Sequence, residues 1–542
     1  MNRSNGLLIR HAAAAASALT LLLAGPVRAQ ELLRTWAGEN GQLRAAEDYF
    51  GSSVSFIGDV DGDGVVDAVI GAPREDPMRN LPVGVVYVIS GATGVTLQKQ
   101  VGTTPTGFFG CDVAGGGDFD GDGVGDYVVG AFQDNSPAGF LTGAAYVYSG
   151  ASGALLDSLF GQVGSSINFG ADVAILGDLN GDGNEEFAVS SSEGIGGRVY
   201  VYSGASGSLL YQVDASVANQ GLVLVCRLGD LNGDGVLEVG VGSVGPASGL
   251  NGEGQFDVLD GPTGNVLVTI IGEVAGDSFG FGAGLGDVDG DGIDDFMVAA
   301  PLHTTNLGTS SDTEGRVYVY SGATATELYR FDGVDSHEGL GSLPVEGAVD
   351  FNRDGFDDIL IGSQGRSTPT RAYGVVLAYS GRTGKLLYEF RGVDDGMETS
   401  AGLGGALSTI GDLNHDGIED LLIGAPFTWT GPRVDAGRAY VFAGNDLFLQ
   451  ANARDYLPGD PITIDLRGGA PGVFGLIAVV DIDGSPMFEP LLLNRLDPDG
   501  NLQFLDTAST DYSGFTVTLM GWAQKAAGRG VIDAFPETIA FQ

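Results

Sequence analysis

The chain has 542 residues, of which 43% are hydrophobic and 18% charged, so it can bury a large core and lacks the composition of a disordered protein. Its formal charge of −45 would repel nucleic acids and anionic membranes, and we exclude both as partners. The 92 glycines follow no Gly-x-y period, which excludes a collagen-like protein and indicates many tight turns.

Residues 1–29 have the features of a signal peptide. Arg3 and Arg10 give a positive start, and Ala12 to Leu23 form an apolar segment too short to span a bilayer. A small-x-small cleavage site at Val27 to Ala29 precedes Gln30. An uncleaved anchor or a structural helix is the alternative. The sequence therefore predicts export to the extracellular space or the cell envelope.

An acidic loop of nine residues occurs seven times in residues 30–446, with the pattern D-x-[DN]-x-D-G-x-x-[DE]. The seven copies begin at Asp59, Asp118, Asp178, Asp230, Asp287, Asp350 and Asp412. Successive starts are separated by 59, 60, 52, 57, 63 and 62 residues. A period of about 60 residues is the mark of a repeat architecture.

Each repeat contains four short runs with strand character. The first precedes the acidic loop and is opened by Phe-Gly in four copies, at Phe50, Phe109, Phe169 and Phe279; the fourth, sixth and seventh copies lack this Phe. The second ends in a Gly-Ala-Pro-like turn, and a Thr-Gly or Ser-Gly turn separates the third from the fourth. Alternating side chains bounded by turn residues predict antiparallel strands. Seven units of four strands predict a seven-bladed β-propeller.

The two ends of the repeat region complement each other. The seventh repeat stops after its third strand, Arg438 to Ala443, whereas Leu32 to Gly38 resembles the fourth-strand pattern of Leu387 to Gly392. We therefore predict that the N-terminal segment supplies the outer strand of the last blade. Such closure removes the open edges that promote aggregation.

Residues 447–542 fall outside the repeats. Alternating segments at Pro461 to Leu466, Gly475 to Val480 and Gly514 to Met520 are separated by turn residues. They predict a small β-sandwich-like domain. The expected fold is thus all-β: a signal peptide (1–29), a seven-bladed propeller (30–446) and a small β-rich domain (447–542).

The acidic loops have the spacing of a calcium site. Positions 1, 3 and 5 converge when the chain winds tightly, Gly at position 6 permits the turn, position 7 can offer its carbonyl, and position 9 adds a carboxylate. Five or more hard oxygens suit Ca²⁺. The candidate ligands are Asp59, Asp61, Asp63, Val65, Asp67, Asp118, Asp120, Asp122, Val124, Asp126, Asp178, Asn180, Asp182, Asn184, Glu186, Asp230, Asn232, Asp234, Val236, Glu238, Asp287, Asp289, Asp291, Ile293, Asp295, Asp350, Asn352, Asp354, Phe356, Asp358, Asp412, Asn414, Asp416, Ile418 and Asp420.

The loops carry 24 ligand carboxylates, so up to seven Ca²⁺ ions would leave a charge of about −10 on them. Without metal, these carboxylates repel one another. A single loop could be an Asp/Gly hairpin turn without an ion, but seven copies with one spacing favour metal binding. The third and fourth loops are the weakest, with Asn at position 3 and Glu at position 9. The sixth and seventh loops, with Arg353 or His415 at position 4, could also stay vacant.

The combination of Phe-Gly, acidic loop and Gly-Ala-Pro in one unit resembles the FG-GAP repeats of integrin α-subunit propellers and their bacterial relatives. The resemblance covers residues 32–444. It implies a calcium-stabilised propeller with a role in extracellular recognition or adhesion. This chain departs from those subunits in having seven near-intact loops where they carry fewer. The leg domains of an integrin are absent, so a heterodimeric receptor role is not implied.

The remaining chemistry gives no active site. Cys111 and Cys226 lie at different positions of different repeats, and we expect two buried free thiols rather than a disulfide. His303, His337 and His415 lie in different repeats and are expected to be solvated. The predicted function is non-catalytic binding of an extracellular protein or polysaccharide. The alternative is a secreted hydrolase, active on phospholipids or glycans, that carries an FG-GAP propeller.

The strand order predicts which face binds the ligand. The acidic loops join first to second strands and the Thr-Gly turns join third to fourth strands, so both lie on one face. The connections from second to third strands lie on the other face and vary most in length, from Ser191–Gly196 to His303–Glu314. Variable loops on a rigid scaffold favour recognition, so we expect ligand binding there. Solvated insertions without a ligand are the alternative.

Overall fold

The computed structural model of the chain describes residues 32–38, 48–77, 81–135, 137, 139, 141–162, 166–193, 196–214, 222–244, 253–304, 313–334, 338–342, 349–351, 355–365, 367–368, 371–391, 400–414, 419–428, 437–444, 448–451, 455–456, 461–467, 474–482, 485–495, 502–507, 516–524, 531–533 and 537–541. The predicted signal peptide, residues 1–29, lies outside these ranges.

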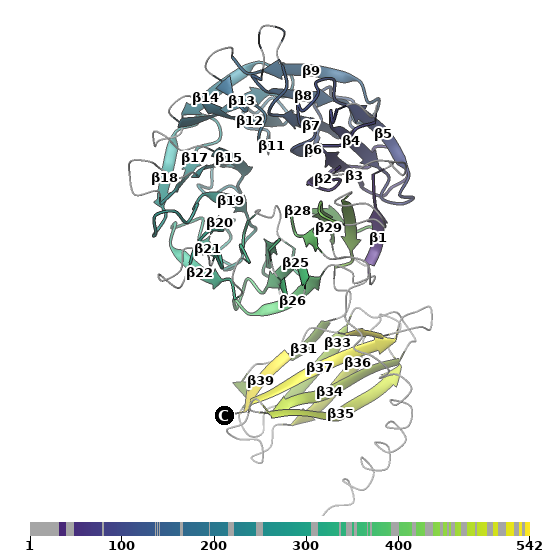
Figure 1. Ribbon diagram of the computed structural model, residues 1–542. Helices are drawn as coiled ribbons and strands as arrows, with labels where there is room; N and C mark the ends of the chain where they lie inside the picture. Colours follow the sequence, from purple (N-terminus) through teal and green to yellow (C-terminus); the bar gives the residue numbers. More distant parts are fainter. Residues whose placement is uncertain are drawn as a thin grey trace, which may run out of the picture.

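The described chain is all-β, and seven sheets form a ring between residues 32 and 444, which confirms the seven-bladed propeller (Figure 1). We number each blade by its acidic loop. Blade 1 has β2 (Ser53–Gly58), β3 (Asp67–Ala72), β4 (Val85–Ile89) and β5 (Thr96–Val101); blade 2 has β6 (Val113–Gly117), β7 (Asp126–Ala131), β8 (Ala144–Tyr148) and β9 (Leu155–Phe160); blade 3 has β11 (Val173–Gly177), β12 (Glu186–Glu193), β13 (Gly196–Ser203) and β14 (Leu209–Asp214), with the short β10 (Ser166–Ile167) beside β12.

The other four blades complete the ring. Blade 4 has β15 (Leu222–Arg227), β16 (Val239–Val244), β17 (Gln255–Leu259) and β18 (Val266–Ile271); blade 5 has β19 (Phe281–Gly284), β20 (Phe296–Ala300), β21 (Arg316–Tyr320) and β22 (Glu327–Asp332). Blade 6 has β23 (Ile359–Ser363), β25 (Arg371–Tyr379) and β26 (Leu386–Arg391), with β24 (Ser367–Thr368) and β27 (Ser400–Leu403) also paired to β25; blade 7 has β28 (Ala406–Gly411), β29 (Asp420–Ala425), β30 (Arg438–Phe442) and β1 (Leu32–Trp36).

The ring closes through the N-terminal strand, as the sequence predicts. β1 pairs antiparallel with β30, with Leu32 opposite Phe442 and Trp36 opposite Ala439. The sheet order in blade 7 is β28, β29, β30, β1, so β1 is its fourth strand. The third strand of blade 7 is therefore not left as an open edge.

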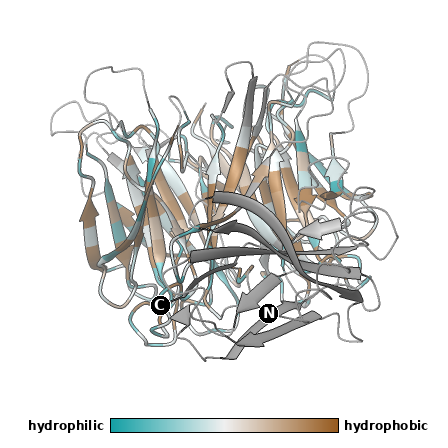
Figure 2. Cartoon of the chain, turned by 90° about the horizontal axis from the view of Figure 1, so that it is seen from below, coloured by the Kyte–Doolittle hydropathy of each residue, from teal (hydrophilic) through white to brown (hydrophobic). Residues whose placement is uncertain are grey.

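The hydrophobic core lies between neighbouring blades. The cluster that joins blade 7 to blade 1 contains Trp36, Phe50, Ile70, Tyr87 and Val441, each at most 5% exposed. Figure 2 shows hydrophobic stretches along the strands of the ring. Burying one large apolar side chain contributes roughly 1.5–3 kcal/mol, so contacts between sheets are a main source of stability.

The Phe-Gly and Gly-Ala-Pro motifs meet at the blade interface. Phe109 of blade 2 is 2% exposed, and Gly110 after it lies against blade 1. A Cβ atom on Gly71, in the Gly-Ala-Pro turn of blade 1, would lie 2.2 Å from the carbonyl oxygen of Gly110. Gly110 has φ +82°, a conformation that favours glycine. Each motif therefore leaves room for the other.

Blades 6 and 7, which lack the Phe, have leucine in its place. Leu340 forms a parallel bridge to Gly315 of the preceding blade, as Phe50 does to Gly437. Leu403 pairs in the same way with Gly374. Both leucines are fully buried. The interface thus requires a large apolar side chain rather than phenylalanine itself.

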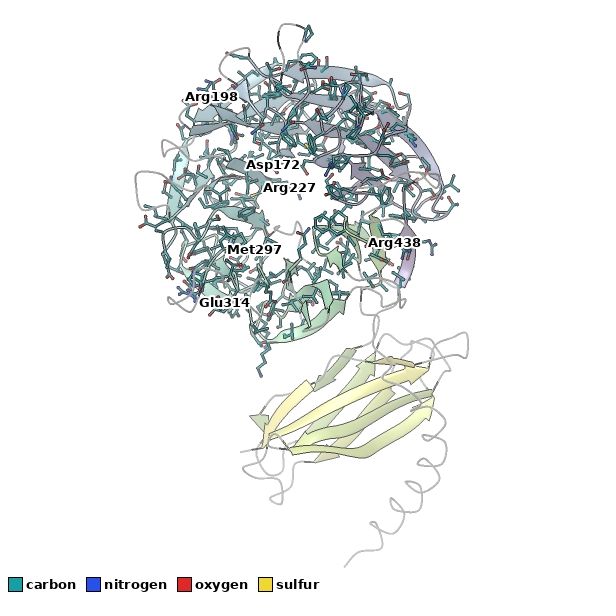
Figure 3. All side chains as sticks on the ribbon, viewed as in Figure 1. Asp172, Arg198, Arg227, Met297, Glu314 and Arg438 are labelled. Carbon is teal, nitrogen blue, oxygen red and sulfur yellow. The ribbon has the colours of Figure 1, made fainter. Side chains whose placement is uncertain are left out.

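Aspartates at the start of the first strand also join blades, near the axis of the ring. Oδ2 of Asp112 accepts the backbone N–H of Val173 at 2.8 Å, and Oδ2 of Asp172 accepts that of Val225 at 2.6 Å. Figure 3 shows Asp172 toward the inner end of its blade. These bonds link blade 2 to blade 3 and blade 3 to blade 4.

Residues 448–541 form two further sheets. Their strands are β31 (Phe448–Ala451), β32 (Asp455–Tyr456), β33 (Pro461–Arg467), β34 (Phe474–Ile482), β35 (Ser485–Arg495), β36 (Leu502–Thr507), β37 (Thr516–Gln524), β38 (Val531–Asp533) and β39 (Glu537–Phe541). β31, β33 and β36 make one sheet and the other strands the second. The sandwich packing and the domain boundary at residue 447 stay predictions. Within the described ranges, no helix is long and apolar enough to cross a membrane.

Candidate metal centres

The described parts of the acidic loops lie on one face of the ring, beside the turns between third and fourth strands. The backbone N–H of Gly91, in that turn of blade 1, donates to Oδ1 of Asp67 at 3.0 Å. Gly150 donates to Asp126 in the same way at 2.9 Å. Because the four strands of a blade are antiparallel in chain order, the connections between second and third strands lie on the opposite face. This confirms the predicted division into two faces.

Backbone hydrogen bonds wind each loop around its first aspartate. In loop 1, Oδ1 of Asp59 accepts from the N–H groups of Gly62 and Asp63 at 2.8 and 3.0 Å, and Oδ2 accepts from Gly64 at 2.8 Å. Asp63 accepts the N–H of Val65 at 3.0 Å. Loop 2 repeats these bonds at 2.7–3.1 Å. An ionised carboxylate offers about four lone-pair sites on its two oxygens, so these bonds position the ligands and still leave sites able to bind metal.

The carboxylate at position 9 is buried in all seven loops, with 0% exposure. Each accepts the backbone N–H of position 2 at 2.5–3.0 Å, as Asp67 does from Val60. In the five loops that have Asp at position 9, the other oxygen of this Asp accepts the backbone N–H of the glycine that follows the third strand of the same blade. In loop 3 the side-chain amide of Asn180 donates instead to Oε1 of Glu186, at 2.7 Å, and loop 4 repeats this pair. In loops 3 and 4, the Asn at position 3 is therefore held by the Glu at position 9 through a side-chain hydrogen bond.

Four loops bring carboxylate oxygens into groups that could hold a metal ion, with all oxygens of a group within 4.8 Å of one another. The groups are Asp59, Asp61 and Asp67; Asp118, Asp120 and Asp122; Asp234, Glu238 and Asp260; and Asp287, Asp289 and Asp291. Loop 3, which is described in full, shows no such group. Clustered carboxylate oxygens repel one another without a cation and suit a hard divalent ion such as Ca²⁺.

Loops 6 and 7 are described in part. Oδ2 of Asp350 accepts the N–H of Gly355 at 2.8 Å, the bond that Gly64 makes in loop 1. The predicted ligands Asn352, Asp354, Asp416 and Ile418 lie outside the described residues. The carbonyl ligand at position 7 stays a prediction in every loop.

Burial perturbs the position-9 carboxylates. Desolvation raises the pKa of Asp67, Asp126 and Asp295 to about 6 and that of Glu238 to about 7. Backbone hydrogen bonds lower these pKa values but do not outweigh burial. A divalent cation beside such a group favours its ionised form, so the donor set fits a metal ion.

Comparison with known protein families matches residues 50–89, 279–320 and 404–442 to the FG-GAP repeat and residues 178–241 to an FG-GAP-like repeat. The propeller thus contains FG-GAP repeats in blades 1, 5 and 7 and an FG-GAP-like repeat that spans blades 3 and 4. It is similar to integrin alpha-5 of Xenopus laevis, with 30% identity over 185 residues, which cover 33% of this chain and 16% of that protein. Integrin alpha-3 of Mus musculus is 37% identical over 158 residues, which cover 27% of this chain and 14% of that protein. Integrin alpha-8 of Mus musculus is 29% identical over 248 residues, which cover 40% of this chain and 22% of that protein. The matches thus span less than a quarter of these relatives.

Among the described residues, the acidic group at loop 4 includes a residue that lies outside the nine-residue pattern. Asp260, in the turn between β17 and β18, offers an oxygen within 4.8 Å of those of Asp234 and Glu238. Other repeats have a serine at this position, such as Ser90 and Ser149. An alignment of the repeats with one another would have revealed Asp260 as an acidic residue at a position that is otherwise serine.

The histidine prediction is wrong for His303. This side chain is 4% exposed, and its Nδ1 lies 2.5 Å from Oδ2 of the buried Asp277. It is buried because it lies at the base of the connection after β20, where its carbonyl accepts the N–H of Gly315. Cys111 and Cys226 are free thiols as predicted; Cys226 is buried, but Cys111 is only partly buried. His11, His337 and His415 lie outside the described residues.

Proposed function

We propose that the chain is a secreted calcium-binding β-propeller that serves as a non-catalytic recognition or adhesion module outside the cell. The observation that carries the proposal is one acidic loop repeated seven times on one face of an FG-GAP propeller. Similarity to integrin α subunits supports a recognition role. The features of a signal peptide in residues 1–29 support export.

Calcium would be held by the carboxylates or amides at positions 1, 3, 5 and 9 and by the carbonyl of position 7. When bound, the ion neutralises side chains that otherwise repel one another. In loop 1, Asp59 and Asp63 are already oriented by the backbone, so little reorganisation is needed on binding. The expected role of calcium is structural.

The calcium proposal is tested on the mature chain by thermal melts in Ca²⁺, in Mg²⁺ and in chelator. An ion that binds only the folded state stabilises it by about 2.7 kcal/mol per site at 100 times Kd. We expect melting temperatures several degrees higher in Ca²⁺ than in chelator, and several calcium ions per chain after dialysis. Coincident melts together with a calcium-free chain would rule the proposal out.

The ligand, an extracellular protein or polysaccharide, would bind the face opposite the calcium loops. The variable length of the connections from second to third strands supports this, because recognition sites concentrate on such loops. Pull-down from the native matrix or envelope would first identify a ligand. Variants shortened between Pro301 and Gly315, or between Pro426 and Gly437, should then lose binding. Thr-Gly turn variants on the calcium side are the matched controls, and loss of binding in these alone would overturn the assignment.

A hydrolase has less support. Within the described residues, His303 is the one histidine, and its burial against Asp277 keeps it from a substrate in solution. The abundant carboxylates are accounted for by the calcium loops. A screen of the purified chain on glycans and phosphodiesters separates the two functions, and turnover above that of the denatured protein would favour the hydrolase.

A further inference from the structure

The fourth strand of each blade lies on the outside of the ring, and one of its two edges is unpaired in the described structure (Figure 1). An unpaired edge offers backbone N–H and C=O groups to a strand of another molecule, and proteins commonly guard it with a charged side chain. Six of the seven outer strands carry such a charge. These strands are β1 (Arg34), β5 (Lys99), β9 (Asp157), β14 (Asp214), β22 (Glu327, Arg330 and Asp332) and β26 (Glu389 and Arg391).

The outer strand of blade 4, β18, is the exception. Its sequence from Val266 to Ile271 is VLVTII, and no charged residue occurs between Asp260 and Glu273. Three of its apolar side chains are exposed, Val266 by 52%, Leu267 by 45% and Ile271 by 62%. A run of β-branched and other apolar residues without charge, proline or glycine is the composition that promotes pairing between strand edges.

The side chains of β18 are divided between a packed and an exposed face. Val268 and Ile270 pack against the hydrophobic cluster between blades 4 and 5. Leu267, Thr269 and Ile271 are exposed on the other face. A β-bulge lies near Leu267, but the outer strands of blades 1 to 6 all have it, so it does not set β18 apart. The exposed face of β18 is therefore an apolar stripe interrupted by one threonine.

The backbone groups that point outward belong to residues of the same stripe. Just after β18, the N–H of Gly272 donates to the carbonyl oxygen of Gly254 at 3.1 Å. In an antiparallel pair, successive residues of a strand alternate between bonding to the paired strand and pointing away from it. The register between β18 and β17 is unbroken from Val268 to Ile271, so Thr269 and Ile271 direct their N–H and C=O groups outward. The edge thus presents hydrogen-bonding groups and apolar side chains together.

We infer that the chain forms a reversible homodimer in which the outer edges of two β18 strands pair antiparallel about a two-fold axis at Thr269. In this register Thr269 lies opposite its own copy, and Ile271 lies opposite Leu267 of the second copy. The outward backbone groups bond to one another, and the apolar side chains of the two stripes come into contact across the strands. A two-fold interface uses the same patch on both copies, so one self-complementary strand is sufficient.

Charge favours this arrangement over other contacts between two copies. Each copy has a formal charge of −45, and its acidic loops lie at the end of the blade where β18 begins. Antiparallel pairing turns the acidic faces of the two rings in opposite directions, whereas parallel pairing would place them side by side. The acids nearest to β18 in sequence lie beyond its ends, and Glu273 is paired with Arg330 at 2.8 Å. The short edge belongs with interfaces below about 1,200 Å², which are typical of transient complexes, so the dimer is reversible.

The test measures the mass of the full mature chain by sedimentation velocity in saturating Ca²⁺ over a wide range of protein concentration. We expect the average mass to rise from that of a monomer toward that of a dimer. Ile271→Lys gives β18 the kind of charge that Lys99 gives β5, at a side chain exposed enough for the fold to tolerate it. It should raise the dimer Kd by about tenfold or more, because the change occurs twice in the dimer. Leu386→Lys is the matched control, because Leu386 is 49% exposed on β26, which already carries charge, and its Kd should be that of the parent.

A second experiment tests the register. Thr269→Cys should form a disulfide-linked dimer on mild oxidation, because this residue lies opposite its own copy. A Cys111→Ser background removes the thiol that is only partly buried. Ser158→Cys is the matched control, because Ser158 lies opposite Tyr146 in blade 2 as Thr269 lies opposite Asp257 in blade 4. It should stay monomeric on non-reducing electrophoresis. Far-UV circular dichroism checks that each variant is folded.

Three outcomes would overturn the inference. A parent chain that stays monomeric at every concentration shows that two β18 edges do not pair, even if the edge binds a strand of another protein. Equal effects of Ile271→Lys and Leu386→Lys would place a dimer contact elsewhere on the chain. Equal crosslinking of the two cysteine variants would refute the pairing at Thr269. The proposed calcium binding and recognition are untouched by each of these results, because β18 contains no predicted calcium ligand and lies outside the connections between second and third strands.

Discussion

Replacing Trp36 by alanine should weaken the propeller by about 3–5 kcal/mol, the cost of removing a buried Trp or Phe from a protein core. Trp36 is 5% exposed and belongs to the cluster of Phe50, Ile70 and Tyr87 between blades 7 and 1. It lies on β1, which is held to blade 7 by one antiparallel pairing with β30. The loss therefore falls on the interface that closes the ring.

Urea denaturation in saturating calcium, followed by far-UV circular dichroism, measures this loss. Leu32→Ala is the matched control, because Leu32 lies on the same strand but is 36% exposed, and we expect it to cost no more than about 0.5 kcal/mol. A chain that starts at Gly41 lacks β1 altogether and should aggregate on size-exclusion chromatography. If Trp36→Ala is as stable as Leu32→Ala and the shortened chain stays monomeric, β1 is not needed to close the ring.

Two further perturbations address the blade interface and the loops. Gly110→Ala should cost about 1–3 kcal/mol more than Gly58→Ala in the same assay, because both glycines have positive φ but only at Gly110 would a Cβ lie 2.8 Å from another side chain; equal losses would contradict this. In chelator, the free energy of unfolding should fall as pH rises from 5 to 7.5. Burial raises the pKa of Asp67 and Asp295 to about 6, above the unfolded value of about 3.9. The folded state therefore holds protons that the unfolded state has already released, and this stabilisation is lost as pH rises through the folded pKa. Calcium should therefore raise the melting temperature more at pH 7.5 than at pH 5, and an equal rise at both would count against the buried carboxylates as ligands.

The repeat itself made the fold predictable. Seven loops at about 60-residue spacing fixed the number of blades, and the likeness of Leu32–Gly38 to Leu387–Gly392 identified the closing strand. Both features are local patterns that recur along the chain, so comparison of the chain with itself reveals them. The winding of loop 1 around Asp59 was equally predictable, because Gly62 and Gly64 permit the turn that its hydrogen bonds require.

Contacts between blades could not be predicted in this way. Leu340 replaces Phe at an interface whose shape is set by Gly315 of the preceding blade. His303 looked solvated because its buried partner, Asp277, is distant in sequence. Asp277 lies in the connection between β18 and β19, before the first strand of blade 5, whereas His303 follows the second strand, β20. The bond from the backbone N–H of Asp118 to Glu185, at position 8 of the next loop, likewise joins two blades, and the nine-residue pattern does not indicate it.

The two faces of the propeller are held together by different means. On one face, the glycines of Phe-Gly and Gly-Ala-Pro pack directly, as Gly110 does on Gly71, and this contact contains no charge. On the other face, neighbouring acidic loops touch through position 8, and their carboxylates repel one another in the absence of a cation. The proposed calcium ions would therefore act mainly on the loop face. The connections from second to third strands emerge at this end of the blades, where the glycine contacts and the bonds of Asp112 and Asp172 to the next blade need no cation. The proposed ligand-binding face should therefore keep its arrangement even when calcium sites are partly filled.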